Sequence, residues 1–398
     1  MGKFRERFLL KQNTPIWHFQ HSQDNATLRA TEVKPKLDRF LLANKSTDIE
    51  KEWFLKDSSQ SLDYKLFIHT EEVPDKPKES TCPQFFGNTG SKKLPSQLAV
   101  SRKKALFFKK NIFLEVFSQY PELIKLIEGC LLEFFFVHNF GTRQSKGYGS
   151  FSYIGKDGSS DEIYCPVSEM LNKRNIFNER NAVEITVLSS FRVESGNYTN
   201  VLNAIDLFYK SIRGGILGKM NPILSDWVLE KNLKWDKEVL ADLFKPVNGR
   251  IPDKNVNEST DFLYRDYLGL AVDMRPWRGR MTKSQSGDDK IKRFKSPVFI
   301  KPVREDKGYR VYIGYNNTVD ELDGKKFKVT FNKNGSKKYK IIQMYPSFKL
   351  DEYLKYCIME GERLVKRNCK IGKEKSDLIV IYSELNKAEN KKWEAEHI

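Results

Sequence analysis

The chain has 398 residues, 39% hydrophobic and 13% aromatic, which is enough apolar material for a packed core and argues against disorder. Its length favours two domains. Lys and Arg number 69 against 52 acidic residues, a formal net charge of +17. Such a surplus favours a polyanionic partner, either nucleic acid or an anionic membrane, although a cationic surface kept for solubility would give the same balance.

Signals for membrane insertion, secretion and metal binding are weak. The longest apolar stretch, residues 131–137, is interrupted by Glu133 and is too short to span a bilayer. The basic N-terminus leads into only three apolar residues, unlike a signal peptide. The five cysteines are scattered and form neither a metal knuckle nor a disulfide framework. We therefore expect a cytoplasmic protein without cofactor or metal.

Hydrophobic periodicity predicts the elements of the first half. Residues 121–137 form its strongest helix, because apolar residues recur there at helical spacing. Residues 71–96, rich in Pro, Lys, Ser and Gly, predict a loop. The other expected elements are a strand within 3–20, a helix over 31–42 with Pro35 in its first turn, a strand over 61–68 that stops before His69, and a strand over 151–154.

The second half has a similar order of elements. β-branched residues predict a strand over 183–188, and an amphipathic pattern predicts a helix over 200–213 that stops at Gly214-Gly215. The further expected elements are a helical stretch over about 222–244, a polar loop over 247–260, strands over 296–301, 309–315 and 326–331, a helix over 350–366 and a strand over 378–382.

The order strand–helix–strands–helix–strand thus occurs in the second half and, loosely, in the first, as a ferredoxin-like βαββαβ unit would produce twice. We predict an α+β fold with two ferredoxin-like (RRM-like) domains, residues 1–181 and 182–398. The second would carry a helical insertion at about 222–244. No repeat is visible in the sequence itself, so the duplication is inferred from element order alone.

The most informative segment is the glycine-rich basic loop, residues 140–150, between the helix over 121–137 and the strand that follows. Its three glycines allow positive φ values and close approach of a partner. Exposed N–H groups and two cations would suit a phosphate backbone, and a tyrosine could stack on a base. A hairpin or bulge with glycines for backbone reasons is the alternative. The residues expected to contact RNA are Gly141, Arg143, Lys146, Gly147, Tyr148 and Gly149.

Better-known glycine motifs do not fit this loop. A Walker A loop that starts at Gly141 would need Gly at position 146, which is Lys. The Gly218-Lys219 pair fails as well, because position 213 is Arg. A dinucleotide fingerprint that starts at Gly147 fails because position 152 is Ser. These failures argue against a nucleotide-dependent enzyme.

A helix followed by F-G-T-R-Q-S-K-G-Y-G-S-F at 140–151 resembles the glycine-rich loop of the RAMP superfamily of CRISPR-associated proteins. The form of the loop is most similar to that of the two-domain tip subunit of type III-B (Cmr) effector complexes. Residues 28–40 resemble the basic segment that opens that subunit's first helix, and residues 293–302 resemble a strand entry common in the superfamily. The resemblance implies ferredoxin-like domains, a loop that touches guide RNA, and other effector subunits as partners.

Two further basic clusters could contact RNA. The first occupies the segment similar to the tip subunit, and the second surrounds a tryptophan near a glycine, a composition that suits an RNA backbone with one stacked base. A mobile basic loop without ligand is the alternative for the second cluster. The residues concerned are Arg29, Lys34, Lys36 and Arg39 in the first cluster, and Arg275, Trp277, Arg278, Arg280 and Arg293 in the second.

Histidines and one aspartate keep an enzymatic alternative open, because some RAMP relatives cleave RNA with a histidine as general acid or base. His18 and His21 flank the end of the first strand, and His138 precedes the glycine loop. Asp24 lies in a polar loop, where type III backbone subunits carry a cleaving aspartate. The simpler interpretation is that His18 packs beside Trp17, His21 and Asp24 are solvated, and His138 caps a helix.

We therefore expect a non-catalytic RNA-binding subunit of a type III CRISPR ribonucleoprotein in antiviral defence. It would contact the guide RNA, or the guide–target RNA duplex, near the distal end of the guide, without a membrane or a small-molecule substrate. The alternatives are a metal-independent endoribonuclease that processes guide RNA, and a scaffold that binds only protein.

Overall fold

The computed structural model describes residues 4–18, 28–56, 58, 60–70, 107–157, 185–247, 258–270, 273–274, 276–285, 294–316 and 319–387. The chain forms two compact units that interleave along the sequence. Unit 1 comprises Met1–Thr186, Arg192–Ile205 and Ile300–Tyr312, and unit 2 comprises Val187–Phe191, Asp206–Phe299 and Ile313–Ile398. The expected domain boundary at 181 and 182 lies outside the described residues, so it stays a prediction.

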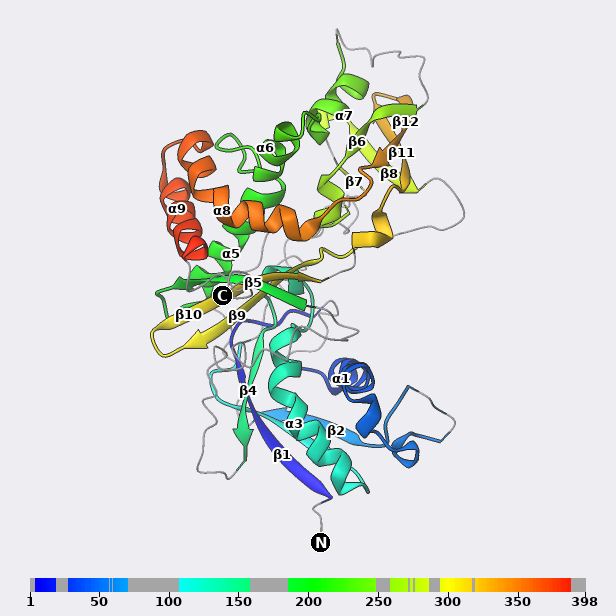
Figure 1. Ribbon diagram of the computed structural model, residues 1–398, viewed down its shortest axis with the longest axis vertical. Helices are drawn as coiled ribbons and strands as arrows, with labels where there is room; N and C mark the ends of the chain where they lie inside the picture. The colour runs from blue at the N-terminus through cyan, green and yellow to red at the C-terminus, as the bar shows by residue number, and fades with distance from the viewer. Residues whose placement is uncertain are drawn as a thin grey trace, which may run out of the picture. The chain divides into compact units, whose positions relative to one another are not determined.

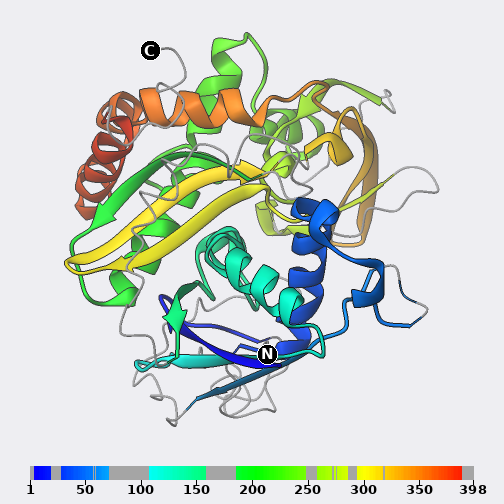
Figure 2. The same cartoon turned by 60° about the horizontal axis from the view of Figure 1, so that its bottom comes forward.

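Unit 1 is built on a four-stranded antiparallel sheet in the order β2-β3-β1-β4. Its chain order is β1-α1-β2-β3-α3-β4, which is the expected βαββαβ order, although no strand had been predicted at β3. Figures 1 and 2 show α1 and α3 on one face of this sheet. The bounds are β1 (Arg5–Gln12), α1 (Ala30–Asn44), β2 (Lys65–Thr70), β3 (Ile112–Phe117), α3 (Pro121–Val137) and β4 (Phe151–Lys156).

The core of unit 1 lies between this sheet and its two helices. Phe8 and Leu10 of β1 are buried and alternate with more exposed residues, as a half-buried strand requires. On the helix side, Phe40 of α1 packs edge-on against Phe134 of α3, with ring centroids 5.7 Å apart. Aromatic packing of this kind fixes both helices over the sheet.

A three-stranded sheet of order β5-β10-β9 follows, and its strands contribute residues to both units. With α5 and α8 it preserves the order βαββα of the second predicted ferredoxin-like domain. A strand was expected to complete that order, but a helix stands in its place. The bounds are β5 (Ile185–Val193), α5 (Tyr198–Arg213), β9 (Val298–Glu305), β10 (Gly308–Asn316) and α8 (Leu350–Asn368).

Unit 2 also contains a five-stranded sheet of order β6-β12-β11-β8-β7, which the sequence predicted only at β11. β12 pairs with β6 in parallel, and the other described pairings in this sheet are antiparallel. The remaining bounds are α6 (Ile223–Glu230), α7 (Asp236–Phe244), β6 (Glu258–Leu263), β7 (Asp273–Met274), β8 (Arg280–Gln285), β11 (Lys326–Lys333), β12 (Ser336–Met344) and α9 (Lys373–Asn386).

Several helix predictions are confirmed and several need correction. Helix α3 has the predicted bounds, and α5 ends at Arg213, before the glycine pair. Pro35 lies inside α1 rather than in its first turn, because α1 begins at Ala30. The single stretch over 222–244 is two helices, α6 and α7. Strand β2 continues through His69 to Thr70 rather than stopping before His69.

The predicted strand over 378–382 is wrong, because these residues lie in the middle of helix α9. Leu378, Ile381, Tyr382 and Leu385 are buried, while Val380 is 59% exposed. That spacing is helical, with one face buried, and the β-branched content had suggested a strand. Tyr382 fits closely over Gly361 of α8, where a Cβ would lie 2.3 Å from Tyr382 Cδ1.

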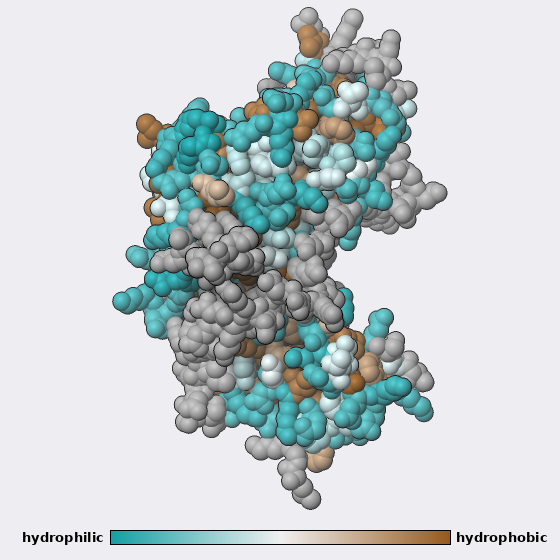
Figure 3. Space-filling model, viewed as in Figure 1, coloured by the Kyte–Doolittle hydropathy of each residue, from teal (hydrophilic) through white to brown (hydrophobic). Residues whose placement is uncertain are grey.

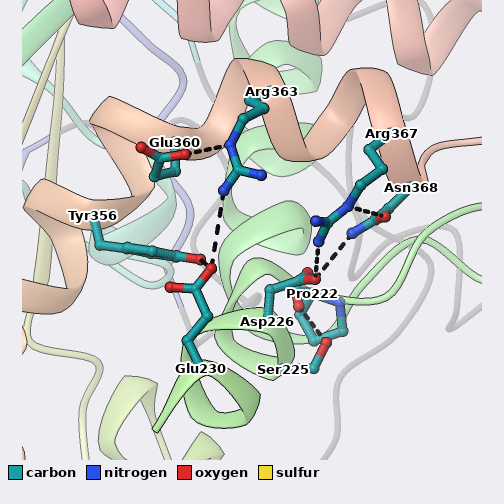
Figure 4. A network of polar contacts seen from close by, with 9 residues as sticks. All are labelled: Pro222, Ser225, Asp226, Glu230, Tyr356, Glu360, Arg363, Arg367 and Asn368. Atoms are coloured by element: carbon teal, nitrogen blue, oxygen red, sulfur yellow. Dashed lines mark hydrogen bonds and ion pairs between the residues drawn. The ribbon is translucent and has the colours of Figure 1, made fainter.

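Polar contacts join α6 to α8 on the surface of unit 2 (Figure 4). Arg367 Nη2 and Asn368 Nδ2 both lie 3.0 Å from Asp226 Oδ1, and Tyr356 Oη donates to Glu230 over 2.7 Å. Exposed ion pairs add little stability, so we assign the packing of these helices mainly to buried Trp227.

Figure 3 shows a described surface that is mainly hydrophilic in that view, with scattered apolar patches. None of the described helices is long and apolar enough to cross a membrane.

Substitution of Gly361 by Ala should lower the melting temperature, because the added methyl group collides with Tyr382. Overpacking of this kind destabilises by about 1–3 kcal/mol. Gly129 of α3 is the matched control, since a Cβ there has nothing within 4 Å. Gly129→Ala should stabilise by about 0.5–1 kcal/mol through the ordinary helix preference for Ala. Thermal unfolding measures the melting temperature of both variants. Equal changes of melting temperature would contradict the close packing of α8 on α9.

Candidate nucleic-acid interface

The glycine-rich loop connects the end of α3 to β4 in unit 1. It contains a 3₁₀ turn, Gln144–Lys146, closed by a hydrogen bond from Lys146 N to Arg143 O of 2.9 Å. Three glycines and Arg143 have positive φ angles, between 59° and 75°. A non-glycine residue in this region is uncommon, so the surrounding contacts must hold Arg143 there.

The glycines are required by contacts inside the protein. A Cβ on Gly149 would lie 1.9 Å from Phe140 O, and one on Gly141 would lie 2.7 Å from Trp17 O. A Cβ on Gly147 would lie 2.7 Å from Ile205 Cδ1. These glycines are therefore explained by close backbone and side-chain neighbours within the protein, without the expected approach of a partner.

Backbone N–H groups of the loop are also largely engaged within the protein. Phe140 N donates to Gly149 O over 2.9 Å, and Gly149 N donates to Pro15 O over 2.9 Å. Thr142 N donates to Trp17 O over 2.7 Å, and Gly141 N donates to Glu32 Oε1 over 2.8 Å. These amides cannot cradle a phosphate in this conformation, which corrects the expectation of exposed N–H donors. Contact with a phosphate then depends on the side chains of the loop.

Lys301 of β9 holds the loop in place, and it was not among the predicted site residues, although it lies in the block 293–302 that resembles a strand entry of the superfamily. Its side chain is fully buried, and its ammonium donates to the carbonyl oxygens of Phe135 at 2.6 Å, His138 at 2.9 Å and Phe151 at 3.1 Å. Asn139 Oδ1 lies 3.3 Å away. One cation thus joins the C-terminus of α3, where positive charge is favoured, to the first residue of β4.

Two opposing effects act on the charge of Lys301. Burial, with a smaller contribution from Lys36, lowers the pKa of Lys301 well below its usual value. All four neighbouring atoms are oxygen acceptors, so an ammonium with three donors fits the site better than an amine with a lone pair. The residue therefore serves as a structural cation rather than as a base.

Asn139 and Ser150 extend the connection between the loop and β9. Asn139 Nδ2 donates to Gln144 O and to Ile300 O, each over 2.9 Å. Ser150 Oγ donates to Pro302 O over 2.7 Å. Because buried hydrogen bonds are strong in a low dielectric, the loop is fixed at both ends before any ligand binds.

The first basic cluster is largely occupied by contacts within unit 1. Lys36 Nζ donates to Glu32 Oε1 and to Asn139 O, each over 3.1 Å, and burial lowers its pKa. Lys34 Nζ donates to Asp38 Oδ2 over 2.8 Å and to Leu62 O over 2.9 Å. These two lysines support the packing of α1, so their predicted contact with RNA has to compete with internal acceptors.

The two arginines of this cluster differ in exposure. Arg39 is exposed on α1, and its Nε donates to Pro35 O over 3.2 Å. Nε and Nη2 of Arg29 are buried, and within the described part of the chain they have no hydrogen-bond partner. Arg39 is thus placed to meet a ligand, whereas Arg29 lies at the start of α1 as its N-cap residue.

Within the glycine loop, Arg143 and Tyr148 differ in their surroundings. The guanidinium carbon of Arg143 lies 5.9 Å from the ring centroid of Trp17, which is 3% exposed. Tyr148 is only 5% exposed. Stacking of a base on Tyr148 would require its ring to leave this position, so the arginine and Lys146 remain as the groups for a phosphate.

The second basic cluster belongs to unit 2 and is described only in part. Trp277 has a φ of 49°, and its ring meets Phe331 edge-on with centroids 5.8 Å apart. Arg280 is exposed at the start of β8. Arg275, Arg293 and the side chain of Arg278 lie outside the described residues. Part of the predicted stacking surface of Trp277 is thus engaged by Phe331.

The described histidines favour the structural interpretation. His138 is the C-cap residue of α3, and its Nδ1 donates to Phe134 O over 2.9 Å, as expected for a helix cap. Its ring packs on Phe134 with centroids 4.6 Å apart. His18 is half-buried, and His21 and Asp24 lie outside the described residues. In the described part of the chain no group of His, Cys, Asp and Glu side chains could hold a metal ion.

Models of known protein families match most of the chain. Residues 3–216 match the model of the Cmr1 N-terminal domain, and residues 219–381 match that of the Cmr1 C-terminal domain. The chain belongs to the Cmr1 family. The predicted resemblance to the RAMP superfamily and its type III-B tip subunit is therefore confirmed, and the Cmr1 assignment makes the chain a type III-B CRISPR effector subunit.

Comparison with solved structures gives a distant likeness to one protein. The chain is similar to the crystal structure of Cmr1 from Pyrococcus furiosus in its apo form, with 12% sequence identity and a TM-score of 0.39. The likeness covers 79% of this chain and 89% of that one. No curated protein gives a significant sequence match.

Replacement of Lys301 by Met should destabilise the protein strongly, because it removes the donor from four oxygen atoms. Each unsatisfied buried polar group costs about 1–3 kcal/mol, so we expect a decrease in stability of about 3 kcal/mol or more. Lys307→Met, at an exposed lysine in the β9–β10 turn, is the matched control and should change little. Thermal unfolding measures both, and a small effect at Lys301 would contradict its structural role.

Proposed function

We propose that this Cmr1-family chain is a non-catalytic RNA-binding subunit of the type III-B effector complex. It contacts the guide RNA, or the guide–target duplex, near the distal end of the guide, and acts in the cytoplasm in antiviral defence. The observation that carries the proposal is the glycine loop, which is held by Lys301 and carries Arg143 and Lys146 at the two ends of its turn.

The chemistry of the loop supports recognition through phosphates. Its amides at Phe140, Gly141, Thr142 and Gly149 are engaged internally, so they offer no donors to a base edge. Two side-chain cations on a fixed backbone can contact phosphate oxygens without reading sequence. A guide RNA has a variable sequence, so a subunit that recognises the RNA backbone and the shape of the RNA suits this partner.

The net charge of +17 supports the same conclusion. Binding through phosphates releases counterions, and the affinity then falls steeply with salt. The loop residues and Arg39 of α1 all belong to unit 1, so we assign the principal RNA contact to this unit.

Double substitution of Arg143 and Lys146 by Ala should weaken RNA binding in a filter assay. The slope of log affinity against log salt should become shallower by roughly 0.7 for each phosphate of single-stranded RNA that the variant no longer neutralises. The control is Lys355→Ala with Lys366→Ala, which removes the same charge from α8, where both lysines pair with acids one turn away. An equal decrease of affinity in the two double variants would mean that only net charge matters and would overturn the role of the loop.

Purified protein incubated with repeat-containing RNA in EDTA should leave the RNA intact. The physical reason is that His138 Nδ1 is engaged by a carbonyl and its ring is packed among aromatic side chains. Gel analysis of end-labelled RNA gives the readout. Site-specific cleavage that is abolished on substitution of His18 or His138 would contradict a non-catalytic role and favour a metal-independent endoribonuclease.

A further inference from the structure

The sheet of unit 1 has a second face, opposite α1 and α3, on which four aromatic rings gather. The register pairs Lys65 with Phe117, Phe67 with Glu115, and His69 with Phe113, so the members of each pair point to the same side. Their sequence neighbours Leu66, Leu114 and Val116 are buried on the helix side. The rings of this face are those of Phe67, His69, Phe113 and Phe117.

Three of these rings are exposed, and the fourth, that of Phe113, is only 8% exposed. Phe67 is 52% exposed and Phe117 is 44% exposed, and they are diagonal neighbours across β2 and β3. Diagonal neighbours of this kind lie roughly 7–8 Å apart. His69 is exposed as well and stacks parallel on Phe113, with centroids 5.3 Å apart and 12° between the planes. Scattered exposed aromatics need no explanation, but adjacent ones on one sheet face form a patch.

Cations surround these rings. Arg5 and Arg7 point to the same face from β1, with side chains 63% and 40% exposed, and both contact the carboxylate of Glu115. Arg7 also pairs with Asp157 and lies over the Phe113 ring at 5.3 Å. Lys65 is exposed beside Phe117. Glu115 is itself only 10% exposed, so it orients the two arginines while leaving their outer edges open.

We propose that this face, which we call the aromatic sheet face, stacks two or three bases of single-stranded RNA. Phe67 and Phe117 stack the bases, and Arg5 and Lys65 contact the neighbouring phosphates. Exposed aromatic rings interleaved with cations on one face of a four-stranded sheet are the arrangement that suits unpaired bases. A protein partner with an apolar surface fits less well, because the cations that flank the rings would be buried with it.

This inference rests on the proposed RNA binding but concerns a different surface from the glycine loop. The two surfaces also differ in chemistry. Removal of a stacking ring lowers affinity without removing a phosphate contact, so it leaves the salt slope unchanged. Removal of the Arg143 and Lys146 side chains changes both affinity and slope. The two surfaces can therefore be tested separately in one assay.

The test measures binding of the full chain to a short single-stranded RNA that contains 2-aminopurine, by fluorescence quenching. Phe67→Ala and Phe117→Ala should each weaken binding about fivefold or more, with weaker quenching and an unchanged salt slope. Phe67→Trp, which keeps a stacking ring, should retain the affinity and the quenching of the unaltered protein. Phe4→Ala is the control, because Phe4 is 54% exposed but precedes β1 and is not one of these rings.

Unchanged affinity in the double variant Phe67→Ala with Phe117→Ala would overturn the inference. If Arg143→Ala with Lys146→Ala still weakens binding in that case, the proposed function stands and only the aromatic sheet face fails. If neither double variant weakens binding, both proposals fail. Failure to assemble with other effector subunits at unchanged RNA affinity would make this face a protein interface and would also overturn the inference.

Discussion

The structure of unit 1 depends on one buried cation, Lys301, and the oxygen atoms around it. The end of α3, the residue that follows it and the start of β4 each direct an oxygen at this ammonium. A carbonyl oxygen without a partner is costly in a protein interior, so these segments cannot separate while the cation stays in place. The glycine loop lies between them, and its path is therefore set by the core rather than by a ligand.

This constraint determines how the loop can bind. Most of its described amides are engaged with Pro15, Trp17, Glu32 and its own residues, and its glycines fill spaces that no side chain could occupy. A ligand would therefore be contacted by side-chain cations, and the loop backbone would change little on binding. Such preorganisation reduces the entropic cost of binding. The aromatic sheet face would add stacking of bases, which contacts to phosphates alone do not provide.

Local patterns in the sequence predicted most elements of unit 1, but not the central strand β3. Pro121 at the start of α3 and the apolar spacing behind it fixed that helix at both ends, because both signals are local. The strand predicted over 378–382 was wrong. β-branched residues favour a strand locally, whereas the packing of Tyr382 on Gly361 stabilises a helix there. Lys301 lies in the block 293–302, but no local pattern indicated its role, since its acceptors come from segments 150–166 residues away. The loop cations were predictable, but the occupied amides were not.

Crosslinking of RNA to protein in the assembled effector complex, followed by mass spectrometry, is the most direct test of RNA binding by the glycine loop. We expect guide RNA to crosslink to the peptide that contains Arg143 and Lys146, and this crosslink should persist across guides of different sequence. Guide RNA that crosslinks to neighbouring subunits but never to this peptide would mean that the loop does not bind it.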